Sequence, residues 1–174
     1  YKRQCDKNLV DSEEMLGMLA ADGHEIVDDE DEAEVIIVNT CCFIGDAKEE
    51  SVNTILEMAE KKKAGTCKVL IVTGCMAQRY KKEISEEIPE VDAILGTTSY
   101  GDISKAVKEA QAGRHFEEYK SIDFLPDISG KRMLTTGGHF AYLKIAEGCD
   151  KHWTYCIIPK LRVSYRSVPM EQLV

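Results

Sequence analysis

Residues 35–75, VIIVNTCCFIGDAKEESVNTILEMAEKKKAGTCKVLIVTGC, decide the fold of this chain of 174 residues. The run at residues 35–38 is short, apolar and rich in β-branched side chains, which predicts a buried strand. Residues 46–64 carry apolar side chains at helical spacing and stop before Gly65, and residues 68–73 form the next apolar run. A strand, a helix and a second strand in this order indicate a βαβ unit with two parallel strands.

The alternation of helix and strand continues on both sides of this unit. A helix is expected from Asp11, which has Glu14 three residues later in a capping-box pattern, to Gly23. Further elements are expected at residues 1–4 (a short first strand), 80–88 (helix), 93–95 (strand) and 103–112 (helix). Residues 1–112 are therefore predicted to form an α/β domain, a mainly parallel sheet with flanking helices.

The pattern changes after residue 112. Residues 113–138 lose periodicity and contain Pro126, Gly130, Gly137 and Gly138, so they are expected to be a linker. The apolar run at residues 140–147 then predicts a strand that opens a second domain at residues 139–174. A further helix is expected after Ser167 and Pro169.

Composition limits the class of protein. The chain has 44% hydrophobic and 30% charged residues, which is ordinary for a globular protein, and its apolar runs are too short for a membrane span. The first residues do not read as a signal peptide, and seven cysteines at irregular spacing favour reduced thiols. We therefore expect a cytoplasmic protein with no membrane contact. Residues 1–60 hold 17 acidic and 4 basic side chains, and the acidic run at 28–34 is either a solvated loop or a face for a basic partner.

Three cysteines occupy corresponding places in this pattern. Cys5 precedes the first helix, Cys41 follows the strand at 35–38, and Cys75 follows the strand at 68–73. The loops after parallel strands share one edge of the sheet, where ligands bind in such folds, so these thiols are expected to converge there. Nearby helix amino termini would favour the thiolate form that binds metals. Cys42 and Cys67 have no such placement and are expected to be packed thiols.

Two more cysteines lie in a loop after the apolar run at 140–147. The stretch 141–166, AYLKIAEGCDKHWTYCIIPKLRVSYR, holds Cys149 and Cys156, and Trp153 and Tyr155 lie between them. Lys160, Arg162 and Arg166 follow, where they either meet anionic groups or form a solvated basic face.

Four segments together resemble one family. CDKNLVDSE (5–13), NTCCFIGDAKEES (39–51), GCMAQRY (74–80) and YLKIAEGCDKHWTYCIIPKLRVSYRS (142–167) are similar to the radical SAM methylthiotransferases, and the segment 39–51 is most similar to their RimO branch. The resemblance implies an amino-terminal methylthiotransferase domain followed by a partial TIM-type barrel. It implies transfer of a methylthio group to an aspartate of a small-subunit ribosomal protein, with two [4Fe-4S] clusters, S-adenosylmethionine and an electron donor such as flavodoxin or ferredoxin.

The resemblance also assigns residues. Cys5, Cys41 and Cys75 match the ligands of the auxiliary cluster, Cys149 and Cys156 match two ligands of the S-adenosylmethionine cluster, and Tyr155 matches the aromatic residue near the adenine. No catalytic acid or base is assigned.

Departures from the family pattern point to a loss of activity. Trp153 stands where CxxxCxxC has its middle cysteine, and an indole offers only an N–H donor. Val163 and Gln4 stand where glycines are usual. We therefore expect the chain as written to be inactive. Two alternatives remain open: a tRNA adenosine methylthiotransferase of the MiaB type, and a non-catalytic iron-sulfur or zinc-binding docking module.

Overall fold

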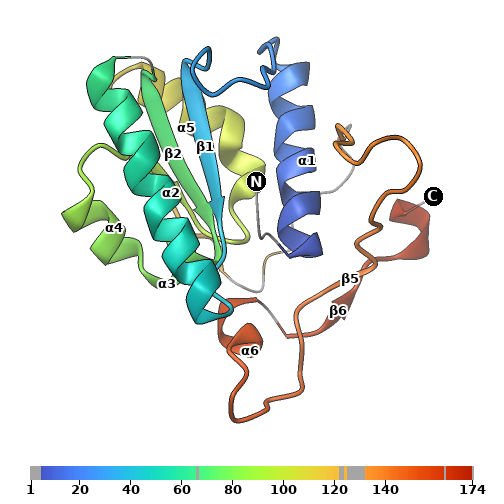
Figure 1. Cartoon of the computed structure of the whole chain (residues 1–174). Coiled ribbons are helices and arrows are strands. Elements are labelled where there is room, and N and C mark those ends of the chain that lie inside the picture. The colour runs from blue at the N-terminus through green and yellow to red at the C-terminus, as the bar shows by residue number, and fades with distance from the viewer. Residues whose placement is uncertain (1–4, 66, 122–123, 125–131, 163, 174) are drawn as a thin grey trace.

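The computed structural model describes residues 5–65, 67–121, 124, 132–162 and 164–173. It shows a parallel sheet with strand order β1-β2-β3-β4 and helices on both faces (Figure 1). The strands are β1 (Val35–Thr40), β2 (Val69–Gly74), β3 (Ala93–Leu95) and β4 (Phe116–Glu118). The predicted fold class, an α/β fold with a mainly parallel sheet and flanking helices, is confirmed.

The βαβ unit of residues 35–75 forms the centre of the sheet. β1 and β2 pair in parallel from Val35 opposite Val69 to Thr40 opposite Gly74. Every residue of β2 is buried, because this strand has a neighbour on each side and helices above and below. That environment explains why residues 69–72 read as a continuous apolar run.

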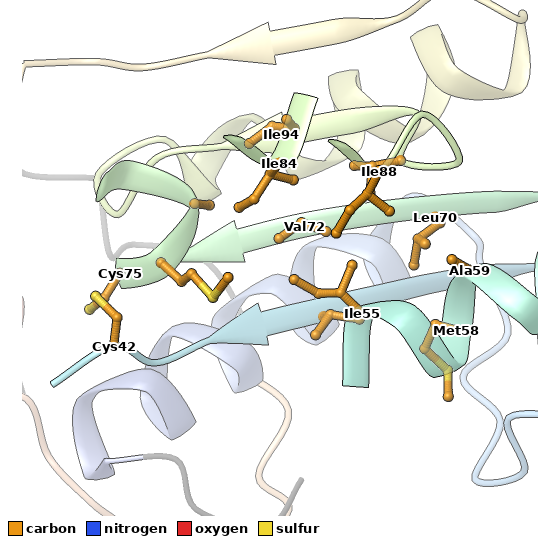
Figure 2. Close-up of a cluster of buried hydrophobic side chains, with 14 of the residues drawn as sticks. Cys42, Ile55, Met58, Ala59, Leu70, Val72, Cys75, Ile84, Ile88 and Ile94 are labelled. Atoms are coloured by element: carbon orange, nitrogen blue, oxygen red, sulfur yellow. The ribbon is translucent and has the colours of Figure 1, made fainter. Parts of the chain in front are cut away.

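Two apolar layers hold the helices to the sheet. On one face lie α2 (Gly45–Ala64), α3 (Cys75–Arg79) and α4 (Lys81–Glu87), whose side chains interlock with those of β2 and β3 in the cluster shown in Figure 2. On the other face, α1 (Asp6–Ala21), the 3-10 turn η1 (Tyr100–Asp102) and α5 (Ile103–Gln111) pack around Ile71 and Leu95. β2 and β3 are therefore shielded from water on each face of the sheet.

The residues at the two ends of α2 explain where this helix begins and ends. Asp46 lies in the first turn of α2 and three lysines lie in its last turn. The helix dipole favours this arrangement, because its amino terminus is partly positive and its carboxyl terminus partly negative. Gly65 ends the helix with φ of 89°, a left-handed conformation that glycine adopts without a Cβ clash. The observed bounds differ from the expected 46–64 by one residue.

The predicted start of the first helix was wrong. α1 begins at Asp6, with Cys5 as its N-cap, and Asp11 and Glu14 lie inside it. Asp11 is buried and ion-paired with residues from the carboxyl-terminal segment, so its capping-box spacing is coincidental. The expected strand at residues 1–4 lies outside the described residues, as do Gln4 and Val163.

The sequence interpretation missed several short elements, and α3 and β4 matter most for the sheet. α3 begins directly at the end of β2, and β4 lies within the stretch 113–138 that was expected to be a linker. β4 pairs in parallel with β3, and its short, half-buried pattern lacks the apolar run that marks β2. The sheet therefore extends beyond residue 112.

The carboxyl-terminal segment is less regular than predicted. Within the expected strand 140–147, only Ala146–Glu147 forms a strand, β5, and it pairs antiparallel with β6 (Arg166–Ser167). After Pro169 the chain forms the 3-10 turn η2 (Met170–Gln172). The short helix α6 (Ile158–Leu161) lies beside the carboxyl end of the sheet, where Thr97 Oγ1 donates to the Leu161 carbonyl at 3.1 Å (Figure 1).

Within the described ranges, no helix is both long enough and apolar enough to span a bilayer.

Candidate functional site

Cys5, Cys41 and Cys75 lie at the carboxyl edge of the sheet. Cys5 is the N-cap of α1, Cys41 follows β1 directly, and Cys75 is the first residue of α3 after β2. Cys41 and Cys75 are buried and Cys5 is exposed. We call these three residues the thiol trio. Thiols from three separate segments of the chain thus occupy one end of the parallel strands.

Two of the thiols are in direct contact. The Cys41 thiol donates a hydrogen bond to Cys5, and this bond lowers the pKa of Cys5 to about 6, although the protein atoms around the Cys5 sulfur partly desolvate it and act in the opposite direction. The same bond and burial raise the pKa of Cys41. The pair therefore favours one thiolate that is stabilised by one neighbouring thiol.

Cys75 completes the trio electrostatically. Burial raises the pKa of its thiol, and the Arg162 guanidinium opposes that rise through its charge and a hydrogen bond. A negative charge on Cys75 raises the pKa of Cys41, and a negative charge on Cys5 raises the pKa of Cys75. The three thiols are therefore close enough to influence one another electrostatically.

Ser51 fixes the backbone of Cys41. Its Oγ accepts from the Cys41 N–H at 3.0 Å and lies 2.9 Å from the Cys41 carbonyl and 2.8 Å from the Ala47 carbonyl. Ser51 lies in α2 and is buried, so the loop after β1 is tied to the helix that follows it. Without this hydroxyl, the buried Cys41 N–H would lose its partner.

Gly74 allows the ends of β1 and β2 to approach closely. Its φ is +93°, and a Cβ at this position would stand 2.4 Å from the Thr40 carbonyl oxygen and 2.5 Å from Asn39 Oδ1. A side chain here would push apart the two strand ends that precede Cys41 and Cys75. Glycine therefore serves the geometry of the trio.

Two asparagines join α1 to the end of β1. Asn8 Nδ2 donates to the Thr40 carbonyl at 2.9 Å, and Asn39 Nδ2 donates to the Asn8 carbonyl at 2.9 Å. Asn8 is fully buried. These bonds hold α1, whose N-cap is Cys5, against the strand that ends before Cys41.

Arg162 lies beside the trio, although it is far away in sequence. Its Nη1 is 3.1 Å from Asp11 Oδ2 and 3.1 Å from Glu147 Oε2, and its Nη2 donates to Asn8 Oδ1. Arg162 is buried, so the solvated basic face considered from the sequence is wrong for this residue. It meets carboxylates instead, which was the other interpretation of the basic cluster.

Further cations surround the same carboxylates. Lys144 Nζ lies 2.5 Å from Asp11 Oδ1, and Lys7 Nζ lies 3.0 Å from Glu147 Oε1. Burial alone would raise the pKa of Glu147, but Arg162, Lys7 and Lys144 outweigh it and lower this pKa to about 2. We call these five residues the Arg162 network.

Sequence reasoning missed Ser51, Asn8, Asp11 and Glu147 as parts of this site. Neither Asp11 nor Glu147 belongs to a recognisable motif. The partners of Asp11 lie 133 and 151 positions away in the sequence, and Glu147 on β5 pairs with Arg162, which follows α6. The signals available were Gly74 directly before Cys75 and the basic cluster that follows Cys156.

Cys42 and Cys67 are buried, as expected for packed thiols. Cys67 Sγ donates to the Val69 carbonyl at 3.1 Å, and burial raises its pKa. Cys42 packs in the same apolar cluster as Cys75, and Figure 2 shows both at the carboxyl end of the strands. Burial raises the pKa of Cys42 to about 11, which favours the neutral thiol.

The loop with Cys149 and Cys156 is more open. Both cysteines are half-buried; the Lys151 N–H lies 3.5 Å from Cys149 Sγ, and the Cys156 N–H donates to the Trp153 carbonyl at 3.0 Å. Trp153 and Tyr155 stack with ring centroids 5.7 Å apart, and their exposed fractions are 57% and 82%. The indole therefore projects toward solvent and offers no ligand atom in place of a thiolate.

The two predicted cluster sites differ in how well they suit a [4Fe-4S] cluster. The trio supplies three thiols from rigid elements, one of them favoured as thiolate, which fits the donor chemistry of such clusters. Among the described residues, no three Cys, His, Asp or Glu side chains are placed so that they could hold a metal ion together, so the side chains of the trio would have to rearrange to bind a cluster. The loop at 149–156 supplies two thiols and does not fit a three-thiolate set.

Comparison of the sequence with known proteins identifies its family and several relatives. Residues 4–96 match the family described as Uncharacterized protein family UPF0004. The chain is 63% identical over 170 residues to "Ribosomal protein uS12 methylthiotransferase RimO" of Lachnoclostridium phytofermentans, and 51% and 50% identical to proteins of the same name from Clostridioides difficile and Trichlorobacter lovleyi. Each match covers 98% of this chain but 38–39% of the relative. The chain therefore belongs to the family described as Uncharacterized protein family UPF0004, and its sequence is similar to part of the relatives that bear the RimO name.

Proposed function

We propose that this chain belongs to a transferase that adds a methylthio group to an aspartate of ribosomal protein uS12. The observation that carries the proposal is the meeting of Cys5, Cys41 and Cys75 at one edge of the sheet, next to a docked segment that bears Cys149 and Cys156. The names of the relatives suggest the substrate. They favour the ribosomal protein over the tRNA adenosine of the alternative.

The proposed cofactors are two [4Fe-4S] clusters and S-adenosylmethionine. When bound, they supply the sulfur to be transferred and the radical that activates the substrate carbon. Cys5, Cys41 and Cys75 are proposed to hold one cluster, and Cys149 and Cys156 to belong to the other, with Tyr155 beside the adenine. The electron donor is proposed to be a flavodoxin or a ferredoxin, and the compartment the cytoplasm.

The roles of this chain's own residues follow from their contacts. The Cys41 thiol stabilises the Cys5 thiolate, Ser51 fixes the Cys41 backbone, and Gly74 lets Cys75 approach Cys41. Each of these prepares thiolate donors at fixed positions, which is what cluster ligation requires. No acid or base is needed from the trio.

Trp153 is proposed to make the chain as written inactive. The loop has two thiols where three are required to leave one iron open for S-adenosylmethionine, and the stacked indole holds the third position. Trp153→Cys is expected to restore the second site.

The proposed domain organisation has limits of 1–112, 113–138 and 139–174, with β4 as an extension of the first sheet.

Anaerobic reconstitution with ferrous iron and sulfide tests cluster binding. The chain is expected to hold about four iron atoms, and Trp153→Cys about eight. Cys41→Ala should lose the trio's iron, whereas the matched control Cys67→Ser, a buried thiol remote from the trio, should keep it. Tight zinc with no visible absorbance would contradict the proposal and favour a docking module.

Substrate identity needs a cellular test. A bacterial strain that lacks its own uS12 methylthiotransferase can express the relative from Lachnoclostridium phytofermentans with its matching segment replaced by this chain, which carries either Trp153 or Trp153→Cys. Mass spectrometry of uS12 is expected to show a methylthio group on aspartate with the cysteine variant alone. A methylthio group on tRNA adenosine, with uS12 unmodified, would overturn the ribosomal-protein assignment.

A further inference from the structure

The Arg162 side chain bonds residues that lie next to both predicted sites in the sequence. It is buried, and its nitrogens bond Asp11 and Asn8 on α1, the helix whose N-cap is Cys5. They also bond Glu147 on β5, two residues before Cys149. The Arg162 guanidinium also acts on the buried Cys75 thiol, through its charge and a hydrogen bond, and opposes the rise in the pKa of Cys75 that burial causes. A planar guanidinium with five donors can serve several acceptors in this way, whereas an ammonium cannot match the same geometry.

The bond between Arg162 and Glu147 closes the base of the loop that carries Cys149 and Cys156. Glu147 lies before the first of these cysteines and Arg162 after the second, and their side chains meet at 3.1 Å. The neighbouring Leu161 is anchored to the sheet edge by the bond from Thr97. The loop is thus attached to the edge of the sheet where the thiol trio lies.

The charge of Arg162 is not needed to neutralise either carboxylate alone. Asp11 has a second cation in Lys144 at 2.5 Å, and Glu147 has a second cation in Lys7 at 3.0 Å. Loss of the guanidinium therefore leaves neither carboxylate without a cation, so an uncharged variant can retain the fold.

We propose that Arg162 is a positioning residue that couples the two cluster sites and holds a fixed positive charge against Cys75. The charge role rests on the proposed function, because it requires a cluster bound by the thiol trio, whereas the coupling does not. A positive charge buried beside a cluster ligand favours the reduced, more negative cluster, because charges interact strongly away from water. Removing that charge should make the reduction potential more negative.

The test compares Arg162→Met, Arg162→Lys and the control Arg114→Met, which removes an exposed arginine paired with Glu109. After anaerobic reconstitution with iron and sulfide, Arg162→Met should show a more negative midpoint potential than the parent chain. Arg162→Lys keeps the charge and should lie near the parent value. Arg114→Met should match the parent. An unchanged potential in a fully loaded Arg162→Met would overturn the charge role.

Hydrogen exchange on the metal-free chains tests the coupling separately. Arg162→Met and Arg162→Lys should both exchange faster over residues 147–162, with α2 protected as in the parent, because neither side chain can bond Asp11, Glu147 and Asn8 together. Unchanged exchange at 147–162 would overturn the coupling. If the parent chain binds no iron, the proposed function fails, and the exchange result still decides whether Arg162 ties the loop to the sheet. If Arg162→Met does not fold, Arg162→Lys carries the exchange comparison.

Discussion

The Cys41 thiol donates a hydrogen bond to the sulfur of Cys5, which joins the loop after β1 to the first turn of α1. This bond lowers the pKa of Cys5 to about 6. In the metal-free protein, Cys5 should therefore react with iodoacetamide already near neutral pH, with a midpoint near 6. Cys41→Ala should move that midpoint toward the ordinary thiol value, because the stabilising donor is gone.

Peptide mass mapping measures this reaction at one cysteine at a time. Cys67, whose pKa is raised by burial, provides the internal control and should stay unmodified in the folded chain. An alkylation profile of Cys5 that is the same with and without Cys41 would contradict the thiol pair.

Glu147 predicts how stability depends on pH. Its folded-state pKa of about 2 lies below its ordinary value of 4.5, so its contribution is fully present above 4.5 and is lost as pH falls toward 2. Glu147→Gln should lower the free energy of unfolding by about 3 kcal/mol at pH 6, since it leaves buried cations without this carboxylate. The difference between the two proteins should shrink between pH 4.5 and 2.

Urea unfolding at several pH values checks this prediction. Glu109→Gln is the control, because Glu109 lies on the surface and pairs with Arg114. A difference between Glu147→Gln and the parent that stays constant down to pH 2 would show that Glu147 is not held as a carboxylate.

Gly74 and Gly65 form a matched pair for testing the close approach of the strand ends. Both have left-handed backbone conformations, with φ of +93° and +89°, but a Cβ at Gly65 would meet nothing within 4 Å. Gly65→Ala should cost about 1 kcal/mol from the backbone alone. Gly74→Ala should cost about 2 kcal/mol more, because its Cβ would collide with Thr40 and Asn39.

The same pair of variants links packing to the trio. Gly74→Ala should also lose iron after reconstitution, whereas Gly65→Ala should keep it. Equal unfolding midpoints for the two alanine variants would contradict a tight contact at the end of β2.

Ser51 offers a test of how Cys41 is held. Ser51→Ala removes the acceptor for the buried Cys41 N–H and should cost about 2 kcal/mol, with weaker iron retention. Thr54→Ala, later in the same helix, removes a hydroxyl that bonds only the Glu50 carbonyl at 2.8 Å. Chelator competition should separate the two variants, and equal iron loss from both would assign the effect to α2 in general.

The fold could be predicted from sequence where the pattern is local. The apolar run of β2 and the glycine after α2 each mark an element through their own residues, so the strands and helices of the βαβ unit were found within one or two residues. β4 escaped because a strand of three half-buried residues has no periodicity of its own. Its pairing with β3 is a tertiary feature.

The site was less accessible to the same reasoning. The loop positions of Cys5, Cys41 and Cys75 predicted their common edge, because the order of parallel strands follows from chain direction. Asp11 instead suggested a helix start, since its local spacing resembled a capping box while its partners, Lys144 and Arg162, come from the far end of the chain. Ion pairs between remote segments leave no periodic signal.

The central claim is that Cys5, Cys41 and Cys75 together hold one cluster. Native mass spectrometry of the anaerobically reconstituted chain tests it directly. The parent chain and a Cys149→Ala/Cys156→Ala variant should each carry the mass of one [4Fe-4S] cluster, and a Cys5→Ala/Cys41→Ala/Cys75→Ala variant should carry none. A cluster that persists without the trio and disappears with Cys149 and Cys156 would contradict the account.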